Sequence, residues 1–367
     1  MQNKVTTLEI KNFKSIKHLQ MNCKRLNVFI GEPNVGKSNI LEALGLFSAD
    51  FSTREDKFLS EFVRYEQFSN LFYDDDLQLV VEVNVEQNGH QLSAILKHQL
   101  NNLDHTDFLI GLRTTVDEFM TTPYNSRGDA FHLSEDLLAK QNLSLPFFYK
   151  ALNSSGKDIG VGYALSSKSP TIYKYDFSKI SFSESKFQKF LMPPNGSNLF
   201  HFVSYNSNLK KEITGIFAQR GLDVVFSKTE NTIELQKKDA DNFIYNYPFS
   251  STADTFQRLV FYLAVIESNK NSVLILEEPE VHSFPPYTTM LAERILEDID
   301  NQYFIATHSP YLLGKLVEKA DFDELNICIA YYENYETKVK ILNEKELQEV
   351  VDYSTDLFFN LSKFTSK

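Results

Sequence analysis

Three glutamates follow a short apolar run. Residues 273–276 read Val-Leu-Ile-Leu, and Glu277, Glu278 and, after one proline, Glu280 come directly behind them. Four β-formers in a row predict a strand that is buried on both faces. Carboxylates at the end of a buried strand are costly unless a cation or hydrogen bonds meet them there. We therefore expect a site that binds a cation here, with a plain acidic turn that caps the strand as the alternative.

A phosphate-binding loop is predicted far upstream. An apolar strand over 26–30 leads into Gly-Glu-Pro-Asn-Val-Gly-Lys-Ser at 31–38, which fits G-x-x-x-x-G-K-[ST], and an amphipathic helix follows from about Lys37. A strand, a loop and a helix in this order are the context that the motif requires. Backbone N–H groups and the helix N-terminus would bind the phosphates. The predicted nucleotide contacts are Gly31, Glu32, Pro33, Asn34, Val35, Gly36, Lys37, Ser38 and Asn39.

Individual roles follow from the chemistry of this loop. Lys37 supplies positive charge to the β- and γ-phosphates, and the Ser38 hydroxyl suits Mg²⁺. Asn34 stands where many such loops have glycine, and asparagine tolerates a left-handed backbone better than most residues. In P-loop NTPases an acidic residue at the end of a neighbouring buried strand also holds Mg²⁺. Glu277 fits that place, and Glu278 would then face the γ-phosphate as the base that activates water.

A histidine follows a further strand. The strand over 303–306 ends in Thr-His-Ser-Pro at 307–310. His308 could donate a hydrogen bond to the γ-phosphate or to the attacking water. A lone histidine is commonly a structural residue, but its place just past a strand and about thirty residues after Glu278 favours a functional role.

The order of these motifs resembles the ATPase head of the ABC/RecF/SMC class, and within it the OLD-like AAA-type ATPases. The likeness covers about residues 1–50 and 245–315, through LEIKNFKSI, VFIGEPNVGKSNILEAL, LILEEPE and FIATHSPYLL. It implies an α/β fold, an ABC-type P-loop NTPase head with a mixed sheet, that hydrolyses ATP to ADP and phosphate with Mg²⁺. It also implies a homodimer or higher homo-oligomer in which each ATP touches the phosphate loop of one subunit and a signature helix of the other.

The signature departs from the family pattern. The expected place reads Pro-Phe-Ser-Ser-Thr-Ala-Asp at 248–254, so Ser250 and Ser251 remain while Thr252 or Ala253 replaces the glycine. Ser251 or Thr252 would make a good N-cap for the helix that follows, and the helix start could meet a phosphate. An ordinary capped helix of the core is the alternative.

Two further polar features lie between the motifs. In the family a glutamine before a strand helps to bind Mg²⁺, and Gln67, before a strand expected from near Leu77, is the candidate. A surface glutamine is the alternative. Three aspartates at 74–76 suggest a metal site, but consecutive carboxylates point in different directions, so we expect a solvated turn.

The chain divides into four predicted segments. Residues 1–99 and 246–320 would form the two halves of the ATPase head, 100–245 an inserted α+β lobe, and 321–367 a short extension with strands and a terminal helix. No heptad pattern is sustained in 100–245, so the long SMC coiled coil is not expected. OLD nucleases carry a Toprim nuclease domain after the ATPase, and the roughly fifty residues behind the histidine are too few for one.

Composition limits the partners and the compartment. The net charge of −12, from 37 Lys and Arg against 49 Asp and Glu, argues against sequence-independent DNA binding by the whole molecule. Two cysteines form neither a disulfide framework nor a zinc cluster, and no apolar run approaches the roughly 20 residues of a membrane helix. We expect a cytoplasmic protein that contacts no membrane. A basic patch or simply the solvated edge of a sheet is open for Lys11, Lys14, Lys17, Lys24 and Arg25.

The resemblance also bears on the biological role. It implies the ATPase subunit of a bacterial anti-phage defence system that controls a separate effector protein, a toxin or nuclease on another chain. A RecF-like DNA repair ATPase, with DNA as a possible partner, is the alternative. A nucleotide-gated scaffold that does not hydrolyse ATP is a third reading.

Overall fold

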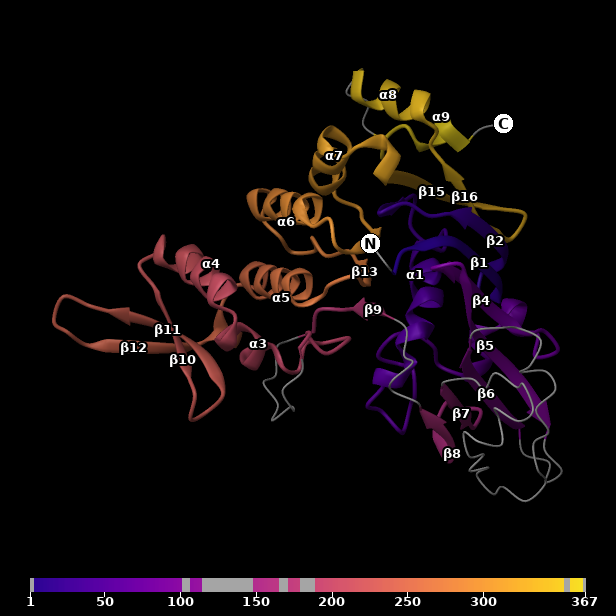
Figure 1. Cartoon of the computed structure of the whole chain (residues 1–367), viewed down its shortest axis with the longest axis horizontal. Coiled ribbons are helices and arrows are strands. Elements are labelled where there is room, and N and C mark those ends of the chain that lie inside the picture. The colour runs from indigo at the N-terminus through magenta and orange to yellow at the C-terminus, as the bar shows by residue number, and fades with distance from the viewer. Residues whose placement is uncertain are drawn as a thin grey trace.

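The computed structural model describes residues 3–100, 106–113, 148–164, 171–178, 189–352 and 357–365, and its strands form three sheets (Figure 1). The central sheet has six strands. In spatial order they are β16 (Glu336–Ile341), β15 (Leu325–Glu333), β3 (Leu26–Ile30), β14 (Gln302–Ala306), β13 (Val273–Glu277) and β9 (Ile172–Tyr175). Five strands run parallel and β16 pairs antiparallel with β15, so the predicted mixed sheet is confirmed.

Both faces of the central sheet are covered. Alternate side chains of β3 explain why, since Leu26, Val28 and Ile30 pack into one apolar cluster and Phe29 into the other. The first cluster contains the inner faces of α5 (Asp254–Ser268), α6 (Pro285–Glu297) and α7 (Pro310–Lys319). The second contains α1 (Lys37–Gly45) and the antiparallel sheet, which lie on the other side in Figure 1. Burial on two faces is what makes these strands read as continuous apolar runs.

The antiparallel sheet has seven strands, which include the N-terminal hairpin. In spatial order they are β2 (Ile16–Asn22), β1 (Val5–Phe13), β4 (Val81–Gln87), β5 (His90–Leu100), β6 (Thr106–Arg113), β7 (Phe148–Leu152) and β8 (Asp158–Ala164). The predicted strand near Leu77 therefore begins at Val81. The 3-10 turns η1 (Leu46–Phe51), η2 (Phe68–Leu71) and η3 (Tyr73–Asp75) connect α1 to β4.

A three-stranded antiparallel sheet projects from the body beside α5. It consists of β10 (Asp223–Ser227), β11 (Thr232–Lys238) and β12 (Ile244–Pro248), with α3 (Leu199–Tyr205) and α4 (Ser207–Ala218) before it in the chain (Figure 1). The predicted single lobe over 100–245 is corrected here. Its described residues divide among three sheets, because β6–β8 extend the antiparallel sheet and β9 is an edge strand of the central sheet. Such long-range pairing leaves no local sequence signal.

The C-terminal part completes the central sheet. The two strands predicted near 324–342 are β15 and β16, joined by a tight turn at Asn334 and Tyr335, which both have positive φ. The predicted terminal helix is instead two helices, α8 (Glu344–Asp352) and α9 (Leu361–Thr365). Within the described parts of the chain, no helix is both long and apolar enough to cross a membrane.

Candidate active site

One edge of the central sheet collects the predicted site residues. Parallel strands end at the same edge, and ligands of α/β sheets bind there. The loop after β3 starts at Gly31, β13 ends at Glu277, and β14 is followed by Thr307 and His308. The sequence predicted these three neighbours, and the strand order places β3, β14 and β13 side by side.

The loop over 31–36 has the backbone that its residue types favour. Asn34 has φ 61, which confirms that this asparagine takes the left-handed conformation usual for glycine. Gly36 has φ 94, and a Cβ added to it would lie 2.1 Å from Thr337 Oγ1. Gly36 is also the N-cap of α1 and offers no side chain to the first turn. The N–H groups of that turn are therefore open to an anion.

Lys37 is buried under this loop. Its Nζ donates to the carbonyl oxygens of Gly31 at 2.9 Å and Glu32 at 2.7 Å. Burial lowers the pKa of Lys37, and the nearby Glu278 carboxylate opposes that shift. The neighbouring contact Asn39 donates from Nδ2 to Ser15 Oγ at 2.7 Å and so fixes α1 against the turn between β1 and β2.

Ser38 and Glu277 meet as the predicted metal pair. Ser38, Glu277 and Glu278 line one cavity of about 280 Å³. Burial alone would raise the pKa of Glu277, but Lys174, the Ser38 hydroxyl and Arg64 bring it below its usual value. A hydroxyl and an ionised carboxylate are the hard oxygen donors that Mg²⁺ takes beside phosphates. The residues present thus fit Mg²⁺.

Glu278 and His308 form a second pair in the same region. His308 Nε2 lies 3.5 Å from Glu278 Oε1, and both side chains are partly exposed. Glu278 has φ 44, and its backbone N–H donates to Ala306 O at 2.9 Å, which ties the end of β13 to the end of β14. Burial and the charge of Lys37 lower the pKa of His308, although Glu278 acts against them. The imidazole is therefore neutral at pH 7.

Glu280 positions this histidine, a role that the sequence reasoning did not assign. Its Oε1 accepts from Thr307 Oγ1 at 2.6 Å and from the backbone N–H of His308 at 3.1 Å. The side chain is buried, and burial raises its pKa. Glu280 and His282 lie in the turn after β13. The signal for Glu280 was its place two residues after Glu278 in a buried turn.

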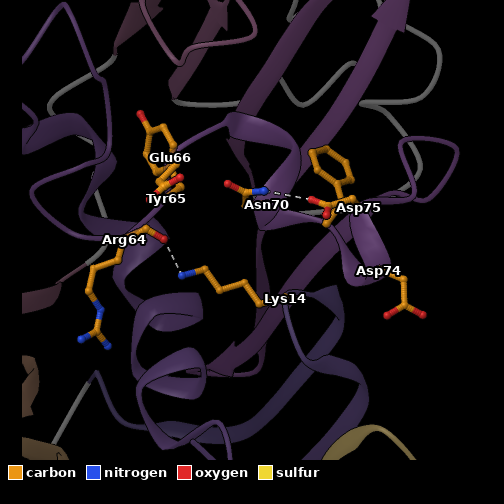
Figure 2. Close-up of a pocket in the computed structure, with 8 residues that line it drawn as sticks. Lys14, Arg64, Tyr65, Glu66, Asn70, Asp74 and Asp75 are labelled. Carbon is orange, nitrogen blue, oxygen red and sulfur yellow. Dashed lines mark hydrogen bonds between the residues drawn. The ribbon is translucent and has the colours of Figure 1, made fainter.

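A chain of ion pairs reaches Glu277 from α1. Glu42 is fully buried on α1 and pairs with Lys14 and with Arg64, whose Nε lies 2.7 Å from Glu42 Oε1. Arg64 Nη2 continues to Glu277 Oε1 at 2.9 Å. Lys14 also donates to the Arg64 carbonyl, and Figure 2 shows it reaching that oxygen while the Arg64 guanidinium extends away from it. Sequence reasoning missed Glu42 and Arg64 because neither stands in a motif.

The edge strand β9 adds two charged groups that were also missed. Lys174 lies on β9 with its side chain 4% exposed, and its Nζ is 3.4 Å from Glu277 Oε2. Asp176 follows the strand and lines the cavity with Ser38 and Glu277. A lysine inside the apolar run Ile-Tyr-Lys-Tyr at 172–175 was the available signal, because buried lysines need a partner.

The signature segment is formed differently from the prediction. Ser250 and Ser251 lie exposed in the 3-10 turn η5 (Phe249–Ser251), and α5 begins at Asp254 with Ala253 as its N-cap. Neither Ser251 nor Thr252 caps the helix, since Thr252 Oγ1 donates to Phe249 O at 2.7 Å. The N-cap prediction is wrong because the Thr252 hydroxyl bonds back to Phe249 within η5 and the helix begins only after Ala253. The trans role of Ser250, Ser251 and Thr252 stays a prediction.

Gln67 lies outside the set around Ser38. It is the exposed N-cap of η2, its backbone N–H donates to Asn70 Oδ1 at 2.9 Å, and it does not line the cavity of Ser38 and Glu277. Its magnesium role therefore stays a prediction. The three aspartates at 74–76 are exposed, as expected for a solvated turn. Asp75 accepts from Asn70 across the shallow pocket of about 550 Å³ in Figure 2.

The N-terminal basic residues do not form a free patch. Lys11 pairs with Glu9 and Glu82, and Lys14 with Glu42. Lys24 donates to backbone carbonyls, and the buried Arg25 pairs with Glu324 at 2.8 Å. These partners favour the simpler reading of a charged sheet edge.

Comparison with known proteins decides the family. A model described as the AAA ATPase domain matches residues 4–259, which is more than half of the chain. The chain belongs to the AAA ATPase domain family. It is also 30% identical over 95 residues to the DNA replication and repair protein RecF of Clostridium perfringens. That match takes in 25% of the chain and 26% of RecF, so the chain spans about a quarter of the length of this relative.

Solved structures of SMC heads are similar to the chain over most of its length. The alignment with the SMC head domain from Thermotoga maritima covers 94% of this chain and 100% of that domain, at 13% sequence identity and a TM-score of 0.40. The alignment with a Smc head domain with an extended coiled coil from Pyrococcus furiosus covers 96% of this chain and 99% of that structure, at 11% sequence identity and a TM-score of 0.48. The ABC-type P-loop head is evident from the strand order and the loop after β3 themselves.

Proposed function

We propose that this member of the AAA ATPase domain family binds ATP with Mg²⁺ and hydrolyses it to ADP and phosphate. The observation that carries the proposal is the pair Glu278–His308, at 3.5 Å, beside Ser38 and Glu277, which line one cavity with Glu278. Side chains from the ends of β13 and β14 and from the first turn of α1 thus supply a base, a hydrogen-bonding imidazole and two oxygen ligands next to a phosphate loop. A binding loop alone would not need the first pair.

Each residue has a step in this mechanism. The α1 N-terminus and Lys37 bind the phosphates, and Lys37 must leave the carbonyls of Gly31 and Glu32 to do so. Mg²⁺, held by Ser38 and Glu277, would supply charge neutralisation at the phosphate oxygens. Glu278 takes a proton from the attacking water, and the neutral imidazole of His308, whose Nε2 lies 3.5 Å from Glu278 Oε1, donates a hydrogen bond to the γ-phosphate.

The experiment compares the parent with Lys37→Ala. The variant should lose ATP binding in a titration with a fluorescent ATP analogue, because the motif holds no second cation for the phosphates, while its circular dichroism stays that of the parent. Release of inorganic phosphate by the purified parent separates an ATPase from a scaffold that only binds nucleotide. Equal affinity of both proteins for the analogue would remove the phosphate-loop assignment.

We further propose that the active form is a homodimer with ATP between two heads. The support is the exposure of Ser250 and Ser251 at the turn before α5, which leaves them accessible to a second subunit. Their polar groups and the start of α5 would contact the nucleotide bound by the partner. The resemblance to ABC-type heads makes this arrangement the expected one.

For the biological role we propose the ATPase subunit of an anti-phage defence system with a separate effector. The resemblance to OLD-like ATPases supports it, as does the net charge of −12, which disfavours DNA as the main partner. The local match to a DNA replication and repair protein keeps a DNA repair role as the second candidate. Affinity purification from the native host, followed by mass spectrometry and by nucleic-acid staining, would recover a second protein in the first case and DNA in the second.

A further inference from the structure

Lys174 lies beside Glu277 and has no part in the proposed ATPase mechanism. It enters from the edge strand β9, its side chain is 4% exposed, and its Nζ donates to Phe62 O at 2.8 Å. The Nζ also lies 3.4 Å from Glu277 Oε2. A buried lysine costs free energy unless it is paired, so its place beside a metal ligand calls for an explanation.

The surroundings are built to hold this lysine. Gly45 ends α1 directly beside it, and a Cβ at Gly45 would lie 3.0 Å from Lys174 Cδ. Gly45 has φ −60, an ordinary helical value, so glycine is needed here for space rather than for backbone freedom. The backbone N–H of Lys174 donates to Ser48 Oγ at 3.0 Å, which fixes β9 against η1, the 3-10 turn that follows α1.

Lys174 faces two carboxylates at neighbouring strand ends. Tyr175 of β9 pairs in register with Leu276 of β13, so Asp176 and Glu277 follow at the same level of the sheet. Burial raises the pKa of Asp176, and the charge of Lys174 opposes this rise. Lys174 Nζ lies 3.4 Å from Glu277 Oε2, and Lys174, Asp176 and Glu277 line the same cavity. One buried cation therefore lies beside both acidic strand ends.

We propose that Lys174 is a fixed counter-ion which keeps the pair Asp176 and Glu277 from binding a divalent cation on its own. Lys174 and the exposed Arg64 both pair with Glu277, so this carboxylate has positive partners without metal. A divalent cation then gains enough attraction only when the phosphates of ATP arrive with it. Lys174 is a positioning residue that makes metal entry depend on nucleotide, and this inference rests on the proposed Mg²⁺–ATP site.

The test measures Mn²⁺ binding without nucleotide, by the loss of the free-ion EPR signal at pH 8. The parent should not reach saturation over the Mn²⁺ range used, whereas Lys174→Met, which keeps the stem and removes the charge, should saturate with an affinity on the order of tenfold tighter than the weakest that this range can detect. Lys174→Arg should behave as the parent. Lys150→Met is the matched control, since Lys150 pairs with Asp158 away from this cavity, and it should change nothing.

Arg64→Gln covers the case in which Lys174→Met fails to fold. Arg64 is 69% exposed, so the variant keeps the core, and it should raise Mn²⁺ affinity by a smaller factor. Folded variants that bind Mn²⁺ no better than the parent would overturn the inference, as would saturable binding to the parent without nucleotide. A parent that binds no Mn²⁺ even with ATP would instead overturn the proposed ATP site, so the two failures are distinguishable.

Discussion

Glu278 has an uncommon backbone for a glutamate. Its φ of 44 is a conformation that costs a non-glycine residue about 1–2 kcal/mol. The hydrogen bond from its N–H to Ala306 O maintains this turn, and the same turn brings its carboxylate to His308. Strain of this kind gathers at functional sites. The backbone therefore supports the assignment of Glu278, rather than Glu277, as the base.

We predict that Glu278→Gln binds ATP but hydrolyses it roughly 10²–10⁴-fold more slowly, because the amide cannot accept a proton from water. Steady-state phosphate release checks the rate, and titration with a fluorescent ATP analogue checks the binding. Glu277→Gln is the comparison and should weaken the magnesium dependence of binding instead. If Glu278→Gln kept the parental rate while Glu277→Gln lost it, the two roles would have to be exchanged.

His308 sets the expected pH dependence. Burial and Lys37 hold its pKa below the usual 6.5, so the neutral form predominates at pH 6.5 and is lost as the pH falls further. The ATPase rate should therefore change little from pH 8 to 7 and decline as the pH falls below 6.5. The free energy of unfolding should change in the same direction. The His308 pKa is lower in the folded protein than in the unfolded chain, so the unfolded chain takes up the proton first and acid destabilises the fold.

A pH–rate profile of the parent and of His308→Gln checks this prediction. The variant should be slower and should lack the decline just below pH 6.5, because glutamine does not titrate. A decline in the parent centred above pH 6.5 would contradict the lowered pKa.

At the scale of elements, the start of α5 is the least conventional part. Its N-cap is Ala253, and its first turn carries Asp254, which pairs with Arg258 at 2.7 Å. An acidic residue stabilises a helix N-terminus, but its negative charge also weakens the positive potential that would attract a phosphate bound by a partner subunit. We therefore expect the trans contact to come mainly from the exposed Ser250 and Ser251.

Ser251→Arg tests that contact. The bulky side chain should block hydrolysis without weakening ATP binding to the isolated subunit, because it clashes only in an assembled dimer. Mixing Ser251→Arg with Lys37→Ala should restore part of the rate, since a heterodimer retains one intact composite site. Phosphate release measured over a range of mixing ratios checks both statements. Normal hydrolysis by Ser251→Arg alone would reduce this segment to an ordinary helix start.

The sequence predicted the strands and loops that carry motifs, and little between them. β3, β13, β14 and the starts of α1 and α6 follow from apolar runs, Gly36 and the prolines at 285–286, which are local signals. The place of β9 next to β13 is a pairing between residues about a hundred positions apart, which no local pattern encodes. Lys174 and Asp176 were missed for that reason, and Arg64 and Glu42 because neither stands in a motif, whereas the position of Glu280 was noticed but its partners were not.

At the scale of the molecule, the proposed composite site would make the oligomeric state depend on nucleotide. Glu278→Gln with Mg²⁺ and ATP should have twice the mass of the parent subunit of 42.3 kDa, since slow hydrolysis retains the nucleotide between two heads. Light scattering coupled to size-exclusion chromatography measures it. The double variant with Lys37→Ala serves as the control and should stay at the mass that it has without ATP. A mass that ignores ATP in both proteins would contradict the sandwich.

The central position of β3 has a consequence for biosynthesis. Leu26 pairs with Tyr303 on one side and Leu325 on the other, although about three quarters of the chain separates Leu26 from either partner in sequence. At a synthesis rate of roughly 5–20 residues per second, β3 leaves the ribosome tens of seconds before either neighbour exists. During that interval an apolar strand has two unpaired edges, which is a template for aggregation. The nascent chain should therefore depend on chaperones that bind its first thirty residues until β14 and β15 emerge.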